Sequence, residues 1–348
     1  MPEHDYIIGW DIGGAHLKAA RLGADGEVLA VAQLAAPLWR GLDQLDEAIK
    51  RVAAEFFPVD ARHAITMTGE MADIFPDRHS GVTSLLRRFA ALVPEERIAV
   101  YAGKAGLVSH RRAEDYITQI ASANWHATAA CAAMNYGSGI LMDIGSTTTD
   151  IIPFLNGAVC ARGWTDFERL RRCELVYTGL VRTPVMAVVQ QVPFRDVRQN
   201  IAAENFATMA DVYRLTGELL EHHDLMETAD SSGKSRRDSA RRLARMVGLD
   251  LDEEAPLEEW VQLAAAIAER QLECIHEAMA EVMDGKAGGV LVGAGCGRFL
   301  ARKLARRADY TYIDFVDQWR VAAAARLKCA DCAAAVSVAE LARISLQA

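Results

Sequence analysis

The sequence predicts an α/β protein in which two similar domains enclose a central cleft. Apolar strand-like segments alternate with amphipathic helical ones, which favours sheets with a parallel part. An Asp-Ile-Gly turn after the first strand recurs near the middle of the chain, so we expect a duplicated architecture. The 348 residues are enough for two domains of ordinary size.

The first domain is expected to span residues 1–137. It begins with three strands, and the turn GADGE at 23–27 joins the second strand to the third. Helix and strand patterns then alternate twice. Strands are expected at 6–11, 17–22, 28–34, 63–70 and 97–103, and helices at 42–56 and 80–92.

The second domain is expected to span residues 138–348. Its opening stretch, GILMDIGSTTTDIIPFLNGAV at 139–159, predicts strand, glycine turn, strand, turn and strand. Aligning Asp11 with Asp143 matches the two openings without a gap and places Lys18 opposite Asp150. A third glycine turn at 288–305 predicts a strand that runs into a helix, and residues about 200–285 predict a helical insertion.

Composition excludes several classes of function. A net charge of −9 argues against a general nucleic-acid binder, and no apolar run approaches the ~20 residues that cross a bilayer. The acidic start MPEHDYIIGWD does not read as a signal peptide. Seven scattered cysteines favour reduced thiols and a cytoplasmic location. The lone CADC motif at Cys329–Cys332 has no second pair, and the nine histidines show no metal-ligand spacing.

The glycine turns predict a phosphate site, because backbone amides in such turns converge on an anion. Lys18 supplies a point charge for a phosphate, while the carboxylates Asp11 and Asp143 end apolar strands beside the first two turns. Carboxylates repel a phosphate unless a hard cation lies between them, so these two aspartates predict Mg²⁺ binding. The phosphate-binding candidates are Gly13, Gly14, Lys18, Gly145, Ser146, Thr147, Thr148, Gly293, Gly295 and Gly297.

Three motifs resemble those of the superfamily of acetate kinase, sugar kinases, Hsp70 and actin. DIGGAHLK resembles its first phosphate motif, DIGSTTTD its second, and GAGCGRFL its nucleoside-proximal motif. The resemblance implies two ribonuclease-H-like domains that close over a phosphate-bearing ligand.

A narrower resemblance suggests a substrate. DIGSTTTDI has the form found in the hydantoinase A and oxoprolinase branch, and further segments lie at 66–75, 121–129, 174–185, 206–219 and 233–246. With these the chain resembles the tetrahydromethanopterin-linked C1-transfer pathway protein family of methanogens and methylotrophic bacteria. The archaeal members of that family are similar to the synthase of the methanofuran core.

The resemblance implies an alkyl transfer. An aminomethyl-furanmethanol diphosphate would be joined to the phenol oxygen of tyrosine, tyramine or glutamylated tyramine, with release of diphosphate. In a bacterium the product would serve methylofuran and one-carbon metabolism. Mg²⁺ held by Asp11 and Asp143 would stabilise the leaving group together with Lys18, without ATP.

The phenol has an ordinary pKa of about 10, so we expect a carboxylate base. Glu70, Asp150 and Asp211 are the candidates, and any of them could instead pair with the aminomethyl group. Glu70 could also cap the following helix, and Asp211 could lie on a solvated face. Lys234 and Arg236 are candidates for an anionic group of the acceptor, although such a charge run usually faces solvent.

Two alternatives from other classes stay open. The first is an ATP-dependent phosphotransferase or ATPase of hydantoinase or oxoprolinase type, under which ATP or ADP would bind. The second is a nucleotide-sensing module without turnover. The expected partners are the small-molecule diphosphate and a phenolic acceptor, with no nucleic acid and no membrane. The identity of the acceptor and the oligomeric state, a homo-oligomer included, are not determined by the sequence.

Overall fold

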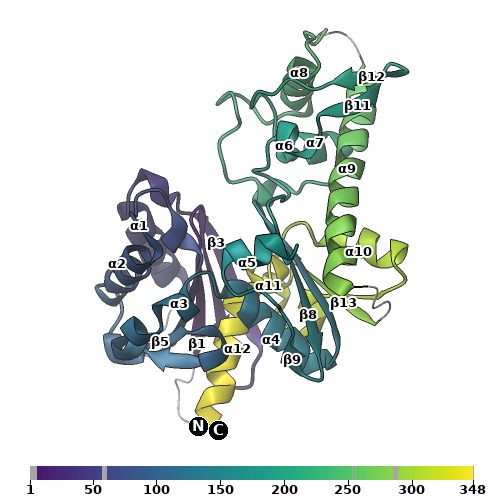
Figure 1. Cartoon of the computed structure of the whole chain (residues 1–348). Helices are drawn as coiled ribbons and strands as arrows, with labels where there is room; N and C mark the ends of the chain where they lie inside the picture. Colours follow the sequence, from purple (N-terminus) through teal and green to yellow (C-terminus); the bar gives the residue numbers. More distant parts are fainter. Residues whose placement is uncertain (1–5, 57–60, 253, 255, 285–288, 348) are drawn as a thin grey trace.

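The first six strands form one mixed sheet in the order β3-β2-β1-β4-β5-β6 (Figure 1). The computed structural model describes residues 6–56, 61–252, 254, 256–284 and 289–347. Strand β1 pairs antiparallel with β2 and parallel with β4, which is the strand arrangement of a ribonuclease-H-like domain. The strands are β1 (Ile7–Ile12), β2 (His16–Leu22), β3 (Val28–Ala35), β4 (Arg62–Met67), β5 (Ile98–Tyr101) and β6 (Leu107–Ser109).

The second sheet repeats this plan in the order β10-β8-β7-β13-β14, with β9 paired to β8. Strand β7 pairs antiparallel with β8 and parallel with β13, as β1 does with β2 and β4. The strands are β7 (Gly139–Ile144), β8 (Thr149–Leu155), β9 (Ala158–Val159), β10 (Leu175–Val176), β13 (Val290–Ala294) and β14 (Thr311–Asp314). The predicted duplication of an α/β unit is therefore confirmed.

Helices separate and cover the two sheets. Ile8, Trp10 and Ile12 face one core with helices α1 and α2, whereas Ile7 on the opposite face belongs to a core shared with α4 and α12. This alternation follows from the two-residue period of a strand that is buried on both faces. The helices of the two domains are α1 (Asp43–Phe56), α2 (Arg78–Ala90), α3 (Ile117–Ile120), α4 (Asn124–Tyr136), α5 (Asp166–Arg171), α10 (Arg298–Arg307), α11 (Ala323–Arg326) and α12 (Ala333–Gln347).

The core between the sheets depends on close backbone packing. A Cβ atom at Gly9 of β1 would lie 1.8 Å from the carbonyl oxygen of Ala335 in α12, so only glycine lets the helix approach. Residues 333–347, which the sequence assigned to the second domain, thus pack on the sheet of the first. Figure 1 shows α12 running alongside β1.

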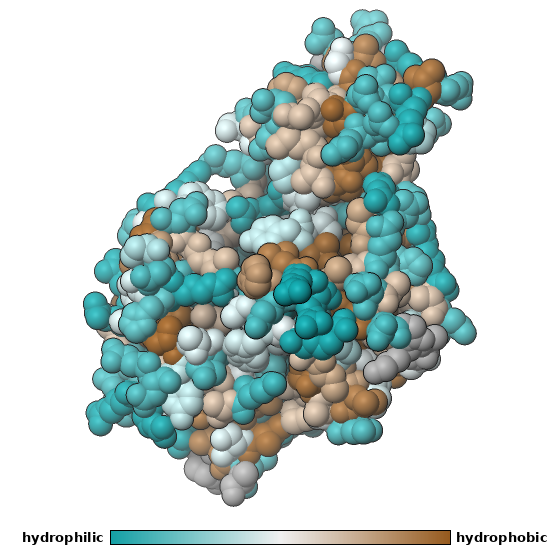
Figure 2. All heavy atoms as spheres, in the orientation of Figure 1, coloured by the Kyte–Doolittle hydropathy of each residue, from teal (hydrophilic) through white to brown (hydrophobic). Residues whose placement is uncertain are grey.

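The insertion forms a separate upper lobe in Figure 1. It contains helices, as predicted, but also the two-stranded sheet β11–β12, and its first helix precedes the predicted start at residue 200. Its elements are α6 (Val185–Val188), β11 (Gln191–Phe194), β12 (Val197–Asn200), α7 (Met209–Thr216), α8 (Arg236–Met246) and α9 (Glu258–Met283). Figure 2 shows that charged and polar residues dominate the outer surface of this lobe. Among the described helices, none has both the length and the apolar character that a membrane span needs.

Because His63 is buried, we expect the free energy of unfolding to decrease at acidic pH. Its Nδ1 accepts a hydrogen bond from Trp10 Nε1 at 3.1 Å, and burial lowers the pKa of His63 to about 4. The unfolded state, with a histidine pKa of about 6.5, therefore binds a proton between pH 6.5 and 4 that the folded state does not. Stability is complete above pH 6.5 and is lost as the pH falls, by about 2 kcal/mol for His63 between pH 8 and pH 5.

Urea unfolding at pH 8 and pH 5 measures this loss. In His63→Gln, which keeps an acceptor for Trp10, the difference between the two pH values should shrink by about 2 kcal/mol. The exposed His79→Gln serves as the matched control. An unchanged pH difference in His63→Gln would show that the buried imidazole is protonated in the folded protein.

Candidate active site

The two predicted turns have the same hydrogen-bond pattern. Gly13 donates its amide to the carbonyl of His16 at 3.0 Å, and Gly145 donates to the carbonyl of Thr148 at 2.9 Å. Both turns connect antiparallel strands whose register pairs Asp11 with Lys18 in the first copy. The sequence repeat therefore corresponds to the same glycine turn between antiparallel strands in both domains.

The carbonyl oxygens of each turn also accept hydrogen bonds from the amides of a neighbouring segment. In the first turn, Gly14 and Ala15 accept bonds from the amides of Leu38 and Ala36, both at 2.9 Å. In the second, Gly145 accepts from Leu180 and Ser146 accepts from Val181 and Arg182 at 2.9–3.0 Å.

The amides on the other side of the turns stay available. Within the described chain, the amides of Gly14, Ala15, Ser146, Thr147 and Thr148 have no protein acceptor. Such convergent amides form an anion site.

Gly179 allows this support of the second turn. A Cβ atom there would lie 2.6 Å from the amide nitrogen of Thr147 and 2.7 Å from the carbonyl of Gly145. We therefore expect Gly179→Ala to displace the turn, destabilise the protein by about 2 kcal/mol and weaken phosphate binding at least about tenfold.

Thermal unfolding and a phosphate titration measure the two effects. For stability the matched control is Gly14→Ala, whose Cβ atom would meet nothing within 4 Å. Unchanged binding and stability in Gly179→Ala would show that the second turn does not depend on this support.

Both turns line one cavity of about 440 Å³ between the two domains. Asp11, Asp143 and Asp150 lie in its wall with Lys18, and all four were predicted site residues. The remaining side chains come from both domains and include Trp39, Ser122, Asn124, Asp166, Arg169, Tyr177 and Arg182. The predicted central cleft is therefore present, and it contains the first two turns.

Three charged groups dominate the floor of the cavity. Burial raises the pKa of Asp143 to about 7 and also raises that of Asp11. Burial opposes the charge of Lys18, but Asp11 and Asp143 outweigh it and hold the pKa of the lysine above its ordinary value. Lys18 is therefore charged at neutral pH, in the electrostatic field of two aspartates.

A divalent cation fits these carboxylates. Oxygen Oδ1 of Asp11 is buried and has no hydrogen-bond partner among the described residues, and the side-chain amide of Asn124 is a donor near the same carboxylate. Carboxylate oxygens next to a phosphate site form the donor set that Mg²⁺ prefers.

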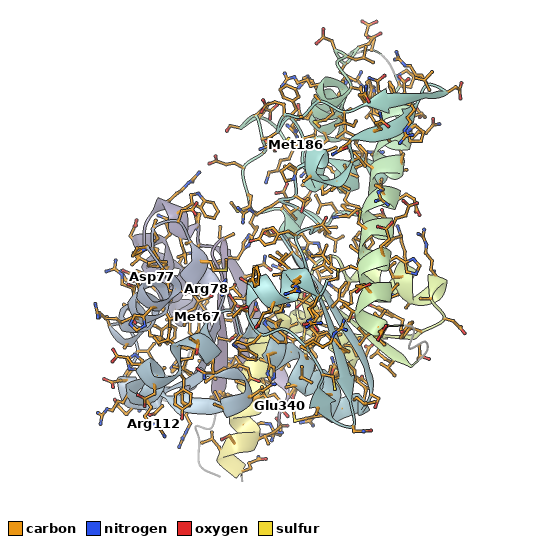
Figure 3. The ribbon with its side chains drawn as sticks, viewed as in Figure 1. Met67, Asp77, Arg78, Arg112, Met186 and Glu340 are labelled. Carbon is orange, nitrogen blue, oxygen red and sulfur yellow. The ribbon has the colours of Figure 1, made fainter. Side chains whose placement is uncertain are left out.

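Asp150 is engaged by an arginine. Arg169 Nη2 lies 2.5 Å from Asp150 Oδ1, and the guanidinium stacks on Trp125 with 4.2 Å to the ring centroid. Burial nevertheless raises the pKa of Asp150. The neighbouring Asp166 pairs at 2.9 Å with Arg78 of α2, which Figure 3 shows between the two domains.

Glu70 lies behind the cavity wall. Its Oε1 accepts a hydrogen bond from Ser122 Oγ at 2.7 Å, and Ser122 lines the cavity. Burial raises the pKa of Glu70, and its Oε2 has no partner. Glu70 therefore reaches the cavity through Ser122.

The structure corrects three predicted site residues in or near the insertion. Asp211 does not line the cavity, because its carboxylate accepts bonds from Ser239 at 2.7 Å and Arg242 at 2.9 Å. It is buried rather than on a solvated face. Lys234 pairs with Asp224 at 3.2 Å, and Arg236 donates to the carbonyl of Leu215. Both side chains therefore bind other residues of the insertion.

The third glycine turn supports the second rather than lining the cavity. Its strand-to-helix context is as predicted, with β13 leading into α10. However, Gly295 donates its amide to Ala330 and Gly297 donates to Ile144, and Gly293 packs against Tyr312. The prediction of phosphate binding at Gly295 and Gly297 is therefore wrong for the amides, which already have protein acceptors.

The CADC segment takes part in a hydrogen-bond cluster that histidine spacing did not reveal. Asp331 accepts bonds from His222 at 3.3 Å, His223 at 3.1 Å and Arg298 at 2.8 Å. His222, His223 and Asp331 could together hold a metal ion, but the guanidinium of Arg298 already supplies a positive charge to the Asp331 carboxylate. Burial raises the pKa of Cys329 to about 12, so this thiol is unreactive.

Sequence reasoning missed several cavity residues. Arg182 and Tyr177 lie in the family-like segment 174–185, and Asn124 lies in the segment 121–129, so these segments contained the signal. His16 was also missed, although it follows the first turn directly. Burial lowers the pKa of His16 to about 4, with help from Lys18 and Arg182, so its imidazole is neutral at pH 7.

Comparisons with known proteins give a family and close relatives. A model of the hydantoinase/oxoprolinase family matches residues 62–336. A (4-{4-[2-(gamma-L-glutamylamino)ethyl]phenoxymethyl}furan-2-yl)methanamine synthase of Methanocaldococcus jannaschii is 31% identical over 274 residues, covering 78% of this chain and 80% of the relative. A synthase of the same name from Methanococcus vannielii is 36% identical over 114 residues, covering 33% of this chain and 51% of the relative.

A solved structure supports the fold. The nucleotide-free structure of an acetone carboxylase, from work on ATP-dependent acetone carboxylation, superposes with a TM-score of 0.53 at 10% identity. The match covers 96% of this chain and 70% of the carboxylase. At this identity the likeness concerns the fold alone.

Proposed function

The chain belongs to the hydantoinase/oxoprolinase family, and we propose that it is a synthase of methanofuran-type cofactor assembly. The name of its relatives describes a furan ring joined through a methylene and an oxygen to a phenyl ring. The proposed reaction forms that ether from an aminomethyl-furanmethanol diphosphate and the phenol of a tyrosine, tyramine or glutamylated tyramine. The enzyme is then a transferase with diphosphate as leaving group.

One observation carries this proposal. Two turns with available amides line one cavity, and Lys18, Asp11 and Asp143 line it as well. Together they suit the binding of a diphosphate and the stabilisation of the charge that develops on it. The cavity is also large enough for a small organic acceptor, and Trp39 and Tyr177 in its wall offer aromatic surface for rings.

Each residue has a distinct part in the proposed reaction. The amides of the turns bind the diphosphate oxygens, and Lys18 holds positive charge beside the leaving oxygen. Asp11 and Asp143 would hold Mg²⁺, which as a Lewis acid would neutralise the diphosphate. Asp150 lines the cavity and is placed to accept the phenol proton, because burial brings its pKa closer to that of a phenol.

We place the enzyme in the cytoplasm. All seven cysteines are free, which suits a reducing compartment. We expect its partners to be the two small molecules, without nucleic acid or membrane.

The test needs no nucleotide. The purified protein is incubated with Mg²⁺, the furan diphosphate and tyrosine, tyramine or γ-glutamyltyramine, and diphosphate release and product mass are followed. A furan–aryl ether is the expected product, and the fastest acceptor identifies the substrate. Absence of ether with every acceptor, with ATP hydrolysed in parallel, would favour an ATP-dependent phosphotransferase. Nucleotide binding without any turnover would favour a sensing module.

A further inference from the structure

Arg182 is a cation of the cavity wall without an acidic partner among the described residues. By contrast, Arg169 is ion-paired with Asp150, and Lys18 lies in the field of Asp11 and Asp143. Within the described residues Arg182 forms no ion pair, and its hydrogen bond goes to the neutral hydroxyl of Thr147 at 3.3 Å. A guanidinium that faces a binding cavity without a carboxylate is available to an anionic ligand.

The position of Arg182 connects it to both glycine turns. Its backbone amide donates to Ser146 and its side chain to Thr147, so it is held on the second turn twice. Its charge also contributes to lowering the pKa of His16, the residue that follows the first turn. An anion bound between the two sets of available amides would therefore lie beside this guanidinium.

Trp39 of the first domain contacts the guanidinium of Arg182. The ring of Trp39 lies 5.1 Å from Arg182 Cζ. Trp39 directly follows Leu38, whose amide holds the first turn, just as the amide of Arg182 holds the second. The two supporting segments thus meet at the cavity, where the Trp39 ring offers a cation–π contact to the guanidinium.

We propose that Arg182 binds the diphosphate of the donor and stabilises its departure, which rests on the proposed function for the identity of that donor. In the step, the bond between the furfuryl carbon and the diphosphate oxygen breaks, and its electron pair stays on the diphosphate. The phenol oxygen forms the new bond to the same carbon and loses its proton to Asp150. Arg182 donates N–H groups to the diphosphate oxygens.

Binding of inorganic diphosphate with Mg²⁺, measured by calorimetry, tests the proposal without turnover. Arg182→Met keeps an apolar stem against Trp39, and we expect it to weaken diphosphate binding about 30-fold. Arg182→Lys should recover part of the affinity, because it restores the charge without the planar fork. Arg87→Met, an exposed arginine of α2, is the matched control and should bind like the wild type.

Steady-state kinetics distinguish binding of the donor's diphosphate from binding of a carboxylate on the acceptor. We expect Arg182→Met to lower kcat about 10²-fold with tyramine and with γ-glutamyltyramine alike. Unchanged diphosphate binding, with a raised KM only for the acceptor that carries a carboxylate, would overturn the proposal. Equal loss of binding in Arg87→Met would also overturn it. Arg182-dependent diphosphate binding in a protein that forms no ether would support this inference while the proposed function fails.

Discussion

Replacing Lys18 with glutamine is expected to lower kcat for ether formation by about 10³-fold. Lys18 lines the cavity in the electrostatic field of Asp11 and Asp143, and its raised pKa keeps it charged throughout the working pH range. The leaving diphosphate gains charge in the transition state, so a fixed cation beside it stabilises that state more than the bound substrate. The effect should therefore appear in kcat more than in KM.

The same substitution should affect folding. Without Lys18, buried Asp11 and partly buried Asp143 lose their shared counter-charge, and the free energy of unfolding is expected to fall by about 3 kcal/mol. Lys18→Arg keeps the charge, so it should retain most of the stability while it loses most of the rate. Lys50→Gln, which removes an exposed lysine paired with Glu47, is the matched control. Full activity in Lys18→Gln would exclude this lysine from leaving-group stabilisation.

Removal of Mg²⁺ by a chelator is expected to abolish ether formation, and added Mg²⁺ should restore it. Asp11 offers a buried oxygen without a partner, and Asp143 lies on the corresponding strand end of the second domain. Both carboxylates would face a diphosphate whose charge has the same sign as theirs. A divalent cation resolves this repulsion, so the unloaded enzyme should bind the donor poorly.

Initial rates against free Mg²⁺ check the assignment of the ligands. Asp11→Asn and Asp143→Asn should each raise the half-saturating Mg²⁺ concentration at least about tenfold, since each removes a charged ligand. Asp115→Asn, an exposed aspartate outside the cavity, should leave it unchanged. Undiminished turnover in excess chelator would show that Lys18 and the turns neutralise the diphosphate by themselves.

Much of the fold and half of the site follow from local patterns. The succession of strands and helices along the first domain could be predicted, because strand and helix patterns alternate between turn residues. The position of Lys18 relative to Asp11 could be predicted as well, since a hairpin register pairs those two residues directly. The repeat then placed Asp150 opposite Asp143 in the second domain.

The partners of long-range hydrogen bonds could not be predicted in this way. The third turn has the glycines of a phosphate turn, yet its amides are used by Ile144 and Ala330, which lie far away in the chain. Asp211 has the charge of a base, yet Arg242 and Ser239 engage it inside the insertion. Whether a polar group is available to a ligand depends on which partners the fold brings within bonding distance.

The sequence by itself therefore determined the duplicated sheets, the two glycine turns and the carboxylates and lysine beside them, because strand register and turn chemistry are local. Only the tertiary structure decided which of the remaining polar groups face the cavity. In the folded chain Arg182 contacts Trp39 of the other domain, and Ser122 lies between Glu70 and the cavity. Lys234 forms an ion pair with Asp224 instead of facing the cavity. The physical reason is that each of these contacts joins segments whose spacing in the sequence carries no periodic signal.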